Sequence, residues 1–193
     1  MSIDYYQQHA QRFFNETVQV DMSELYDRFL AYLPPGAQIL DAGCGSGRDA
    51  SAFLARGYSV EAFDASSEMA QRASALTGLP INVLRFEDFN APARYDGIWC
   101  CASLLHVAEA DLPAVFDRLA NALKPNGVWY FSFKMGRGER EKDGRRFTDL
   151  EETRLRALMA ALPELDVKAV WQTADKRVGR DEVWLNGLVV KVR

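Results

Sequence analysis

The stretch ILDAGCGSGRD, residues 39–49, constrains the fold more than any other part of this 193-residue chain. An apolar run ends at Ala42, and three alternating glycines follow at Gly43, Gly45 and Gly47. Glycine allows backbone conformations closed to other residues and lets a ligand approach without meeting a Cβ atom. Such a turn from a buried strand into a helix predicts a loop that holds a flat or elongated ligand at the carboxyl ends of a sheet.

Strand-like and helical segments alternate along the chain. The apolar spacing predicts strands over residues 37–42, 58–64, 81–86, 95–103 and 127–134, and helices over 51–57, 66–76, 112–124 and 148–162. The last two strand-like segments, 165–173 and 181–192, have no helix between them and are expected to pair antiparallel. This pattern predicts an α/β fold with a doubly wound, mostly parallel seven-stranded sheet, helices on both faces and an antiparallel last strand.

Two smaller features belong to the same prediction. Thr148 and Asp149 are candidate caps for the helix over 148–162, with Glu151 at capping-box spacing from Thr148. Residues 134–147 are rich in charge and are expected to form a loop that borders the ligand cleft or a solvated flap.

Composition narrows the possible classes. Hydrophobic residues make up 48% of the chain, which is enough for the core of a single domain. The net charge of -4 gives no support for a nucleic-acid partner, and no apolar run is long enough to span a membrane. The three cysteines, Cys44, Cys100 and Cys101, show neither disulfide nor metal-site spacing. We therefore expect a cytoplasmic protein, a monomer or homodimer, without a metal.

The spacing of the glycines can be compared with known glycine-rich loops. A P-loop is excluded because no lysine follows Gly47. The dinucleotide pattern G-x-G-x-x-G is one residue too long, since Arg48 stands where its third glycine would fall. Asp64, at the end of the second strand, is placed to accept hydrogen bonds from two ribose hydroxyls, as in many adenosine binders. An NAD-dependent oxidoreductase stays an alternative that the glycine spacing disfavours.

The segments ILDAGCGSGRD, VEAFDAS and YDGIWCCASLLHV together resemble the class I S-adenosylmethionine-dependent methyltransferases. Within that class the chain is similar to small bacterial enzymes grouped with tellurite-resistance and ubiquinone-biosynthesis methyltransferases. The resemblance covers nearly the whole chain and implies the Rossmann-like methyltransferase fold. It also implies S-adenosylmethionine as cofactor, S-adenosylhomocysteine as product and methyl transfer to a small molecule. A non-catalytic module that only binds S-adenosylmethionine is the alternative.

The resemblance also assigns roles to individual residues. The implied cofactor-binding residues are Asp41, Gly43, Cys44, Gly45 and Arg48 at the methionine part, Asp64 at the ribose, Ala65, Met69, Glu87, Asp88 and Phe89 at the adenine, and Cys101, Ala102 and Ser103 beneath the sulfonium. Asp88 is expected to accept from the adenine amino group, although an acid at this place also suits a loop or a helix cap.

His106 follows the fourth strand, at the mouth of the expected cleft. As a neutral imidazole it could take a proton from the acceptor and is the candidate catalytic residue. The alternative is a histidine that binds a backbone group and shapes the pocket. A base is optional here, because alignment of the reacting atoms alone can supply roughly 7–11 kcal/mol.

Two segments, one charged and one aromatic, are candidates to bind the methyl acceptor. Residues 134–147 carry an excess of three positive charges, which could attract an anionic acceptor, and Lys134 and Arg137 lie nearest the strand end. The segment YYQQHAQRFF has the pattern of an amphipathic helix. The resemblance implies that residues 1–33 form a helical lid over a core of residues 34–193, with Tyr5 and Tyr6 toward the ligand. Alternatively, these aromatic rings pack on the sheet.

Overall fold

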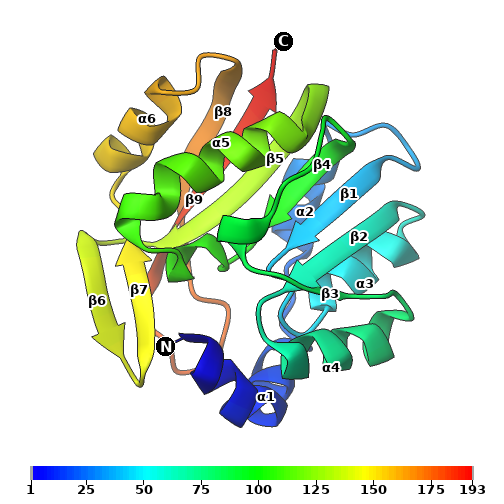
Figure 1. Cartoon of the computed structure of the whole chain (residues 1–193), viewed down its shortest axis with the longest axis vertical. Coiled ribbons are helices and arrows are strands. Elements are labelled where there is room, and N and C mark those ends of the chain that lie inside the picture. Colours follow the sequence, from blue (N-terminus) through cyan, green and yellow to red (C-terminus); the bar gives the residue numbers. More distant parts are fainter. Residues whose placement is uncertain (1, 193) are drawn as a thin grey trace.

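The computed structural model describes residues 2–192, which form a seven-stranded sheet in the order β3-β2-β1-β4-β5-β9-β8 (Figure 1). The strands are β1 (Gln38–Ala42), β2 (Ser59–Asp64), β3 (Asn82–Val83), β4 (Tyr95–Cys100), β5 (Leu123–Lys134), β8 (Leu165–Ala174) and β9 (Val183–Lys191). Strands β1 to β5 pair in parallel, whereas β9 runs antiparallel to both β5 and β8. The predicted doubly wound sheet is confirmed.

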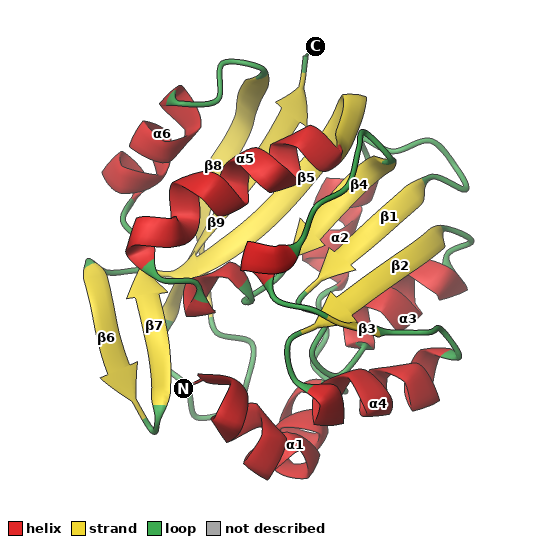
Figure 2. Ribbon diagram, viewed as in Figure 1, coloured by secondary structure: helices red, strands yellow, loops and turns green. Residues whose placement is uncertain are grey.

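Helices cover both faces of this sheet (Figure 2). They are α1 (Ser2–Thr17), α2 (Ser23–Leu30), α3 (Arg48–Ala55), α4 (Ser67–Thr77), α5 (Leu112–Ala122) and α6 (Glu152–Ala160). Side chains of β1 alternate between the two layers, as the period of a strand requires. Ile39 packs in the cluster that contains residues of α2 and α3, and Leu40 packs in the cluster that contains residues of α5 and α6.

The glycines of the loop after β1 are all required by its geometry. Gly43, Gly45 and Gly47 have φ of 73°, 53° and 79°, in the left-handed region that favours glycine. A Cβ on Gly43 would lie 2.5 Å from the Cβ of Ser103, and one on Gly47 would lie 2.9 Å from the Cβ of Ala73. The loop is therefore pressed between the segment after β4 and helix α4.

The expectation of a loop over residues 134–147 is wrong. This part of the chain forms an antiparallel hairpin of β6 (Gly138–Lys142) and β7 (Arg145–Asp149), which lies beside the main sheet in Figure 1. Its tight turn has positive φ at Asp143 and Gly144, which suits a two-residue hairpin turn. Phe147 is buried and anchors the hairpin, although most of the hairpin's side chains are polar.

Other boundaries also differ from the expectation. The last helix begins at Glu152, so Thr148 and Asp149 do not cap it. Thr148 is a buried residue of β7 instead, and its hydroxyl donates to the carbonyl of Val107 over 2.7 Å. The strand predicted over 81–86 shrinks to β3, which has only two residues, and the short 3-10 helix η1 (Phe86–Asp88) follows it.

The ends of two further elements move by a few residues. Strand β4 ends at Cys100 because Ala102 takes a left-handed φ of 52°. Helix α5 ends at Ala122, and β5 begins directly at Leu123. None of the helices within residues 2–192 combines the length and the apolar character that a membrane crossing needs.

Candidate functional site

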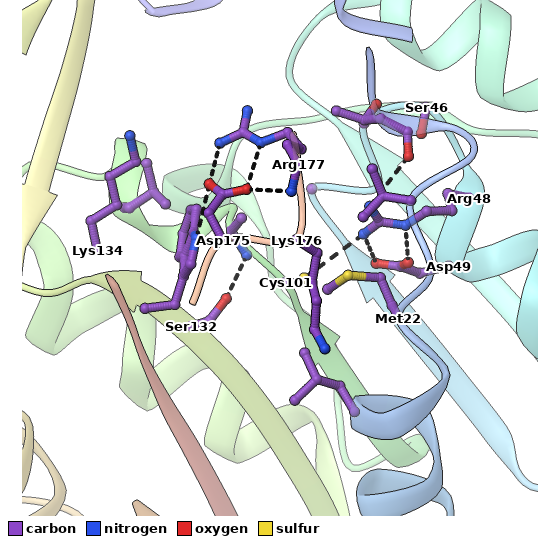
Figure 3. A pocket seen from close by; sticks show the side chains of 18 of the residues that line it. Met22, Ser46, Arg48, Asp49, Cys101, Ser132, Lys134, Asp175, Lys176 and Arg177 are labelled. Carbon is purple, nitrogen blue, oxygen red and sulfur yellow. Dashed lines mark hydrogen bonds and ion pairs between the residues drawn. The ribbon is translucent and has the colours of Figure 1, made fainter. Parts of the chain in front are cut away.

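Two cavities meet above the glycine loop, at the carboxyl ends of the parallel strands. They hold about 1040 Å³ and 1220 Å³ of empty space, open solvent at their mouths included. The residues that line both are Tyr6, Phe13, Gly43, Gly45, Ala102 and His106. The first cavity extends toward β5 and the segment between β8 and β9, and the second extends toward α4 and η1. Figure 3 shows the first cavity, with Arg48 and Asp49 on one side and Lys134, Asp175 and Arg177 on the other.

Asp64 is the last residue of β2 and lines the second cavity. One of its carboxylate oxygens accepts from the amide of Gly45 at 2.8 Å, and the other accepts from the amide of Ser66 at 2.9 Å. Burial raises the pKa of this carboxyl group, while the two amide donors oppose the shift. A carboxylate has about four acceptor positions, so two remain for a ligand.

Around Asp64 the structure gathers some of the predicted adenine-side residues and leaves others out. Ala65, Met69 and Glu87 line the second cavity. Asp88 is exposed and does not line either cavity. Phe89 is buried in the core, where its ring stacks on Phe63 with centroids 5.3 Å apart.

Arg85 and Phe86, which line the second cavity beside Glu87, were not predicted as site residues. Both precede the predicted acidic residues Glu87 and Asp88. Strand β3 ends at Val83 and η1 begins at Phe86, so Phe86 does not lie in a strand as expected.

A buried carboxylate that was not predicted lies at the other end of the loop. Asp49 is 6% exposed and lines the first cavity. It accepts from the Tyr26 hydroxyl at 2.5 Å, from Nε1 of Trp99 at 2.8 Å and from Nε of Arg48 at 2.6 Å. Burial alone would raise the pKa of Asp49, but the adjacent Arg48 guanidinium holds it below its usual value.

Asp41 lies behind this group instead of in the cavity. It is 2% exposed, and one carboxylate oxygen accepts from the amide of Ala50 at 3.0 Å. Burial and then the charge of Asp49 raise the pKa of Asp41 well above its usual range. Asp41 thus fixes the first turn of α3 and is not among the cavity-lining side chains, whereas Arg48 is.

The residues predicted beneath the sulfonium lie along the boundary of the two cavities. Cys44 and Cys101 line the first, Ser103 lines the second, and Ala102 lines both. The Ser103 hydroxyl donates to the carbonyl of Ala42 at 2.8 Å, and the amide of Ala102 donates to the hydroxyl of Ser132 at 2.8 Å. These bonds tie the end of β4 to β1 and β5.

Of the two cations predicted on the acceptor side, only Lys134 reaches a cavity. Lys134 is 7% exposed at the end of β5, forms an ion pair with Glu182 and lies 4.4 Å from the ring centroid of Phe147. Burial lowers the pKa of its ammonium group. Arg137 is 83% exposed, pairs with Glu151 at 2.7 Å and lines neither cavity.

The segment between β8 and β9 forms a wall of the first cavity that the sequence did not indicate. Asp175 and Arg177 of this segment line the cavity, together with Trp184 at the start of β9. Arg177 donates to Asp175 at 2.6 and 3.0 Å, and Nε1 of Trp184 donates to the same carboxylate at 3.2 Å. These hydrogen bonds hold the segment against the start of β9, where Trp184 pairs with Lys134 of β5.

His106 is held at both ring nitrogens. Nδ1 lies 2.8 Å from the carbonyl oxygen of Arg146, which can only accept, so Nδ1 carries the hydrogen. In the neutral ring Nε2 then accepts from the Tyr6 hydroxyl, also at 2.8 Å. Burial lowers the pKa of His106 to about 4, and the positive charges of Arg145 and Lys134 act in the same direction. The imidazole is neutral at pH 7.

This shift predicts a pH dependence of stability. Because the folded protein holds His106 neutral while the unfolded chain binds a proton below a pKa of 6.5, stability falls as the pH drops from 6.5 toward 4. We expect the His106→Gln variant to show a flatter decline over this window in urea unfolding measured at several pH values. Parallel curves for the variant and the unchanged protein would contradict the assignment.

Helix α1 lies across the cavities and is bonded to both sides of them. Tyr6 lines both cavities, whereas Tyr5 lines neither and stacks on His9 with centroids 4.3 Å apart. Gln7 accepts from the Ser66 hydroxyl at 2.7 Å, and the Ser2 hydroxyl accepts from the amide of Arg146 at 2.9 Å. The helix thus bridges α4 and the β6–β7 hairpin.

No group of three or more His, Cys, Asp or Glu side chains within residues 2–192 is arranged to hold a metal ion.

Similar proteins were found by sequence and by structure. A ubiquinone biosynthesis O-methyltransferase from Xylella fastidiosa is 35% identical over 104 residues, which is 50% of this chain and 42% of that protein. This chain thus spans less than half the length of that relative. The Burkholderia thailandensis 1,6-didemethyltoxoflavin-N1-methyltransferase has a similar structure, with a TM-score of 0.78, 22% identity and coverage of 99% of this chain and 85% of that chain.

A [4+2]-cyclase, SpnF, also shares the fold, with a TM-score of 0.74, 16% identity and coverage of 98% of this chain and 94% of that chain. At these identities the two structural likenesses establish the fold alone. The family model described as a methyltransferase domain matches residues 14–175, which include the glycine loop, Asp64 and His106. The family prediction is confirmed, and the chain belongs to the methyltransferase domain family.

Proposed function

We propose that this protein transfers a methyl group from S-adenosylmethionine to a small-molecule acceptor that carries negative charge. The observation that carries the proposal is Asp64, which keeps two acceptor positions free beside a loop of bare backbone. Two neighbouring ribose hydroxyls need just such a carboxylate, and an adenosine lying on Gly43 and Gly45 would meet no Cβ atom.

The residues present fit the whole cofactor. Ala65, Met69, Phe86 and Glu87 would surround the adenine in the second cavity. In the first cavity, the Arg48 guanidinium offers a cation that matches the carboxylate of an amino acid. Cys101 and Ala102 would lie along the connection between these two parts, since both cavities meet there.

The cofactor supplies an electrophilic methyl group on its sulfonium. The task of the protein is to align the acceptor with that group and to exclude water, which can account for roughly 7–11 kcal/mol of the barrier. His106 serves this alignment: its Nδ1–H is held by Arg146, and its Nε2 orients the Tyr6 hydroxyl at the boundary of the two cavities. An imidazole with a pKa of about 4 retains an abstracted proton poorly at pH 7, so we assign His106 to positioning and not to proton abstraction.

A negative charge on the acceptor is supported by the lining of the first cavity. Its charged side chains are the cations Arg48, Lys134, Arg145, Lys176 and Arg177 and the anions Asp49 and Asp175. Positive charge therefore prevails in the cavity, although the protein as a whole carries a net charge of -4. A cavity of this sign concentrates anionic ligands.

Residues 1–33 act as a lid in this proposal, over the single catalytic domain formed with residues 34–193. The support is that α1 contacts α4 through Gln7 and the hairpin through Ser2, on opposite sides of the cavities. We also propose that the protein is a monomer or homodimer and that it is cytoplasmic; its three free cysteines agree with a reducing compartment.

Calorimetric titration with S-adenosylmethionine, S-adenosylhomocysteine and NADH tests the cofactor. We expect both adenosyl ligands to bind and NADH not to bind. Tight NADH binding without adenosyl binding would favour an oxidoreductase and overturn the proposal. Acceptors are then screened with S-adenosylmethionine labelled at the methyl group. A protein that binds the cofactor yet labels no acceptor in an extract of small molecules would be a binding module instead of a transferase.

A further inference from the structure

Three cationic side chains surround one buried phenyl ring. Lys134 Nζ lies 4.4 Å from the ring centroid of Phe147, and the guanidinium carbons of Arg140 and Arg145 lie 4.8 and 5.1 Å from it. Contacts between cations and an aromatic face are favourable one at a time, but three like charges at one ring repel each other. Nearby anions must offset this repulsion.

Two of these three cations have a close carboxylate. Lys134 forms an ion pair with Glu182, and Arg140 forms one with Asp149. Among residues 2–192 the carboxylate paired with Arg145 is that of Asp143, which is 3.6 Å away and 63% exposed. An ion pair of that length to a solvated group compensates little charge.

The Arg145 guanidinium is also incompletely hydrogen-bonded. Its side chain is 15% exposed, and its Nε is buried without a hydrogen-bond partner among residues 2–192. Its guanidinium carbon lies over the Tyr5 ring, 4.2 Å from the centroid. A guanidinium stacked on aromatic rings presents its N–H edge to ligands, and that edge matches two coplanar oxygens.

The place of Arg145 connects it to the acceptor cavity. Arg145 and Lys134 both line the first cavity, together with Tyr6 and His106. Both also lie close to the same ring, 4.4 and 5.1 Å from the centroid of Phe147. An anion between them would neutralise the surplus charge next to the point where the two cavities meet.

From this arrangement we infer that the acceptor carries a carboxylate and that Arg145, on β7, is the residue that binds it. A single uncompensated guanidinium matches one negative charge, so a carboxylate fits better than a phosphate dianion. The aromatic rings of Tyr6, Phe147 and Trp184 in the same cavity favour a planar, ring-bearing acid. This inference rests on the proposed function, because the cavity is an acceptor site only in a transferase.

Benzoate and its neutral isostere benzamide are suitable probes. We expect calorimetry to show benzoate binding at least about tenfold tighter than benzamide, as hydrogen bonds to a charged group require. The Arg145→Gln variant should lose this preference, and Arg145→Lys should recover part of it. The control is Arg156→Gln, which removes the same charge from an exposed pair on α6 and should bind both probes like the unchanged protein.

Each titration is run with and without S-adenosylhomocysteine. Equal affinity for the two probes, no measurable binding of benzoate, or a preference that survives in Arg145→Gln would overturn the inference. Normal binding of S-adenosylhomocysteine in the same samples shows that the variant is folded and that the proposed cofactor site stands regardless of the result for benzoate. If the unchanged protein does not bind S-adenosylhomocysteine, the result counts against the proposed function. The titrations with benzoate in the absence of S-adenosylhomocysteine still test Arg145.

Discussion

Replacing Asp64 with alanine is expected to weaken binding of S-adenosylmethionine and S-adenosylhomocysteine by at least about 100-fold, since two hydrogen bonds to a charged acceptor are lost. Asp64 would hold both ribose hydroxyls with the acceptor positions that the amides of Gly45 and Ser66 leave free. Calorimetric titration of the purified variant measures the effect directly.

The variant also removes the acceptors of these two loop amides, so a control for the loop is needed. Asp64→Asn keeps the shape and one acceptor oxygen and should bind with intermediate affinity. Asp117→Ala removes an exposed carboxylate on α5 and should bind like the unchanged protein. If Asp64→Ala binds S-adenosylhomocysteine as tightly as Asp117→Ala does, the ribose assignment is wrong.

Replacing Asp49 with alanine is expected to lower the free energy of unfolding by about 3–5 kcal/mol, the usual cost of breaking a buried ion pair. The change strands three donors in the interior: the Tyr26 hydroxyl, Nε1 of Trp99 and the Arg48 guanidinium. For a chain of this size the melting temperature should fall on the order of 10 °C. Urea unfolding followed by tryptophan fluorescence gives the free energy, and a thermal melt gives the temperature.

The matched control is Asp166→Ala, which removes a carboxylate from an exposed pair with Lys168 on β8. It should change the free energy of unfolding by less than about 0.5 kcal/mol, because surface ion pairs contribute little. Asp49→Asn retains one acceptor oxygen, which can serve Tyr26 or Trp99 but not both because they donate to different oxygens of Asp49, and its stability should lie between the two. Equal stability of Asp49→Ala and Asp166→Ala would mean that the buried network does not stabilise the fold.

The features that were predictable from the sequence are those that depend on neighbours along the chain. Gly43, Gly45 and Gly47 have positive φ, and the residue type alone indicates this conformation because glycine adopts it readily. The alternation of strand-like and helical segments predicted a mostly parallel sheet, because buried parallel strands are apolar throughout. Asp64 was identifiable for the same reason, since it is the acidic residue that ends the apolar strand β2.

The features that escaped prediction depend on contacts between distant segments. The β6–β7 hairpin has few apolar residues, and the burial of its Phe147 and Thr148 comes from neighbours such as Lys134 and Val107. Arg145 and Arg137 are both arginines of the same charged segment, so the sequence does not distinguish their surroundings. In the structure Arg145 lies on β7 and lines the first cavity, whereas Arg137 precedes β6 and is exposed with Glu151 as its partner.

The chain separates its two sets of cavity residues by position. The glycine loop, Asp64 and the end of β4 all precede residue 104, whereas Lys134 ends β5, and Arg145, Phe147 and the segment between β8 and β9 follow it. Segments after β5 can therefore diverge in evolution without disturbing the backbone geometry of the loop. In the proposed transferase, exchanging the β6–β7 hairpin and the segment between β8 and β9 is therefore a route to new acceptors that leaves the glycine loop and Asp64 unchanged.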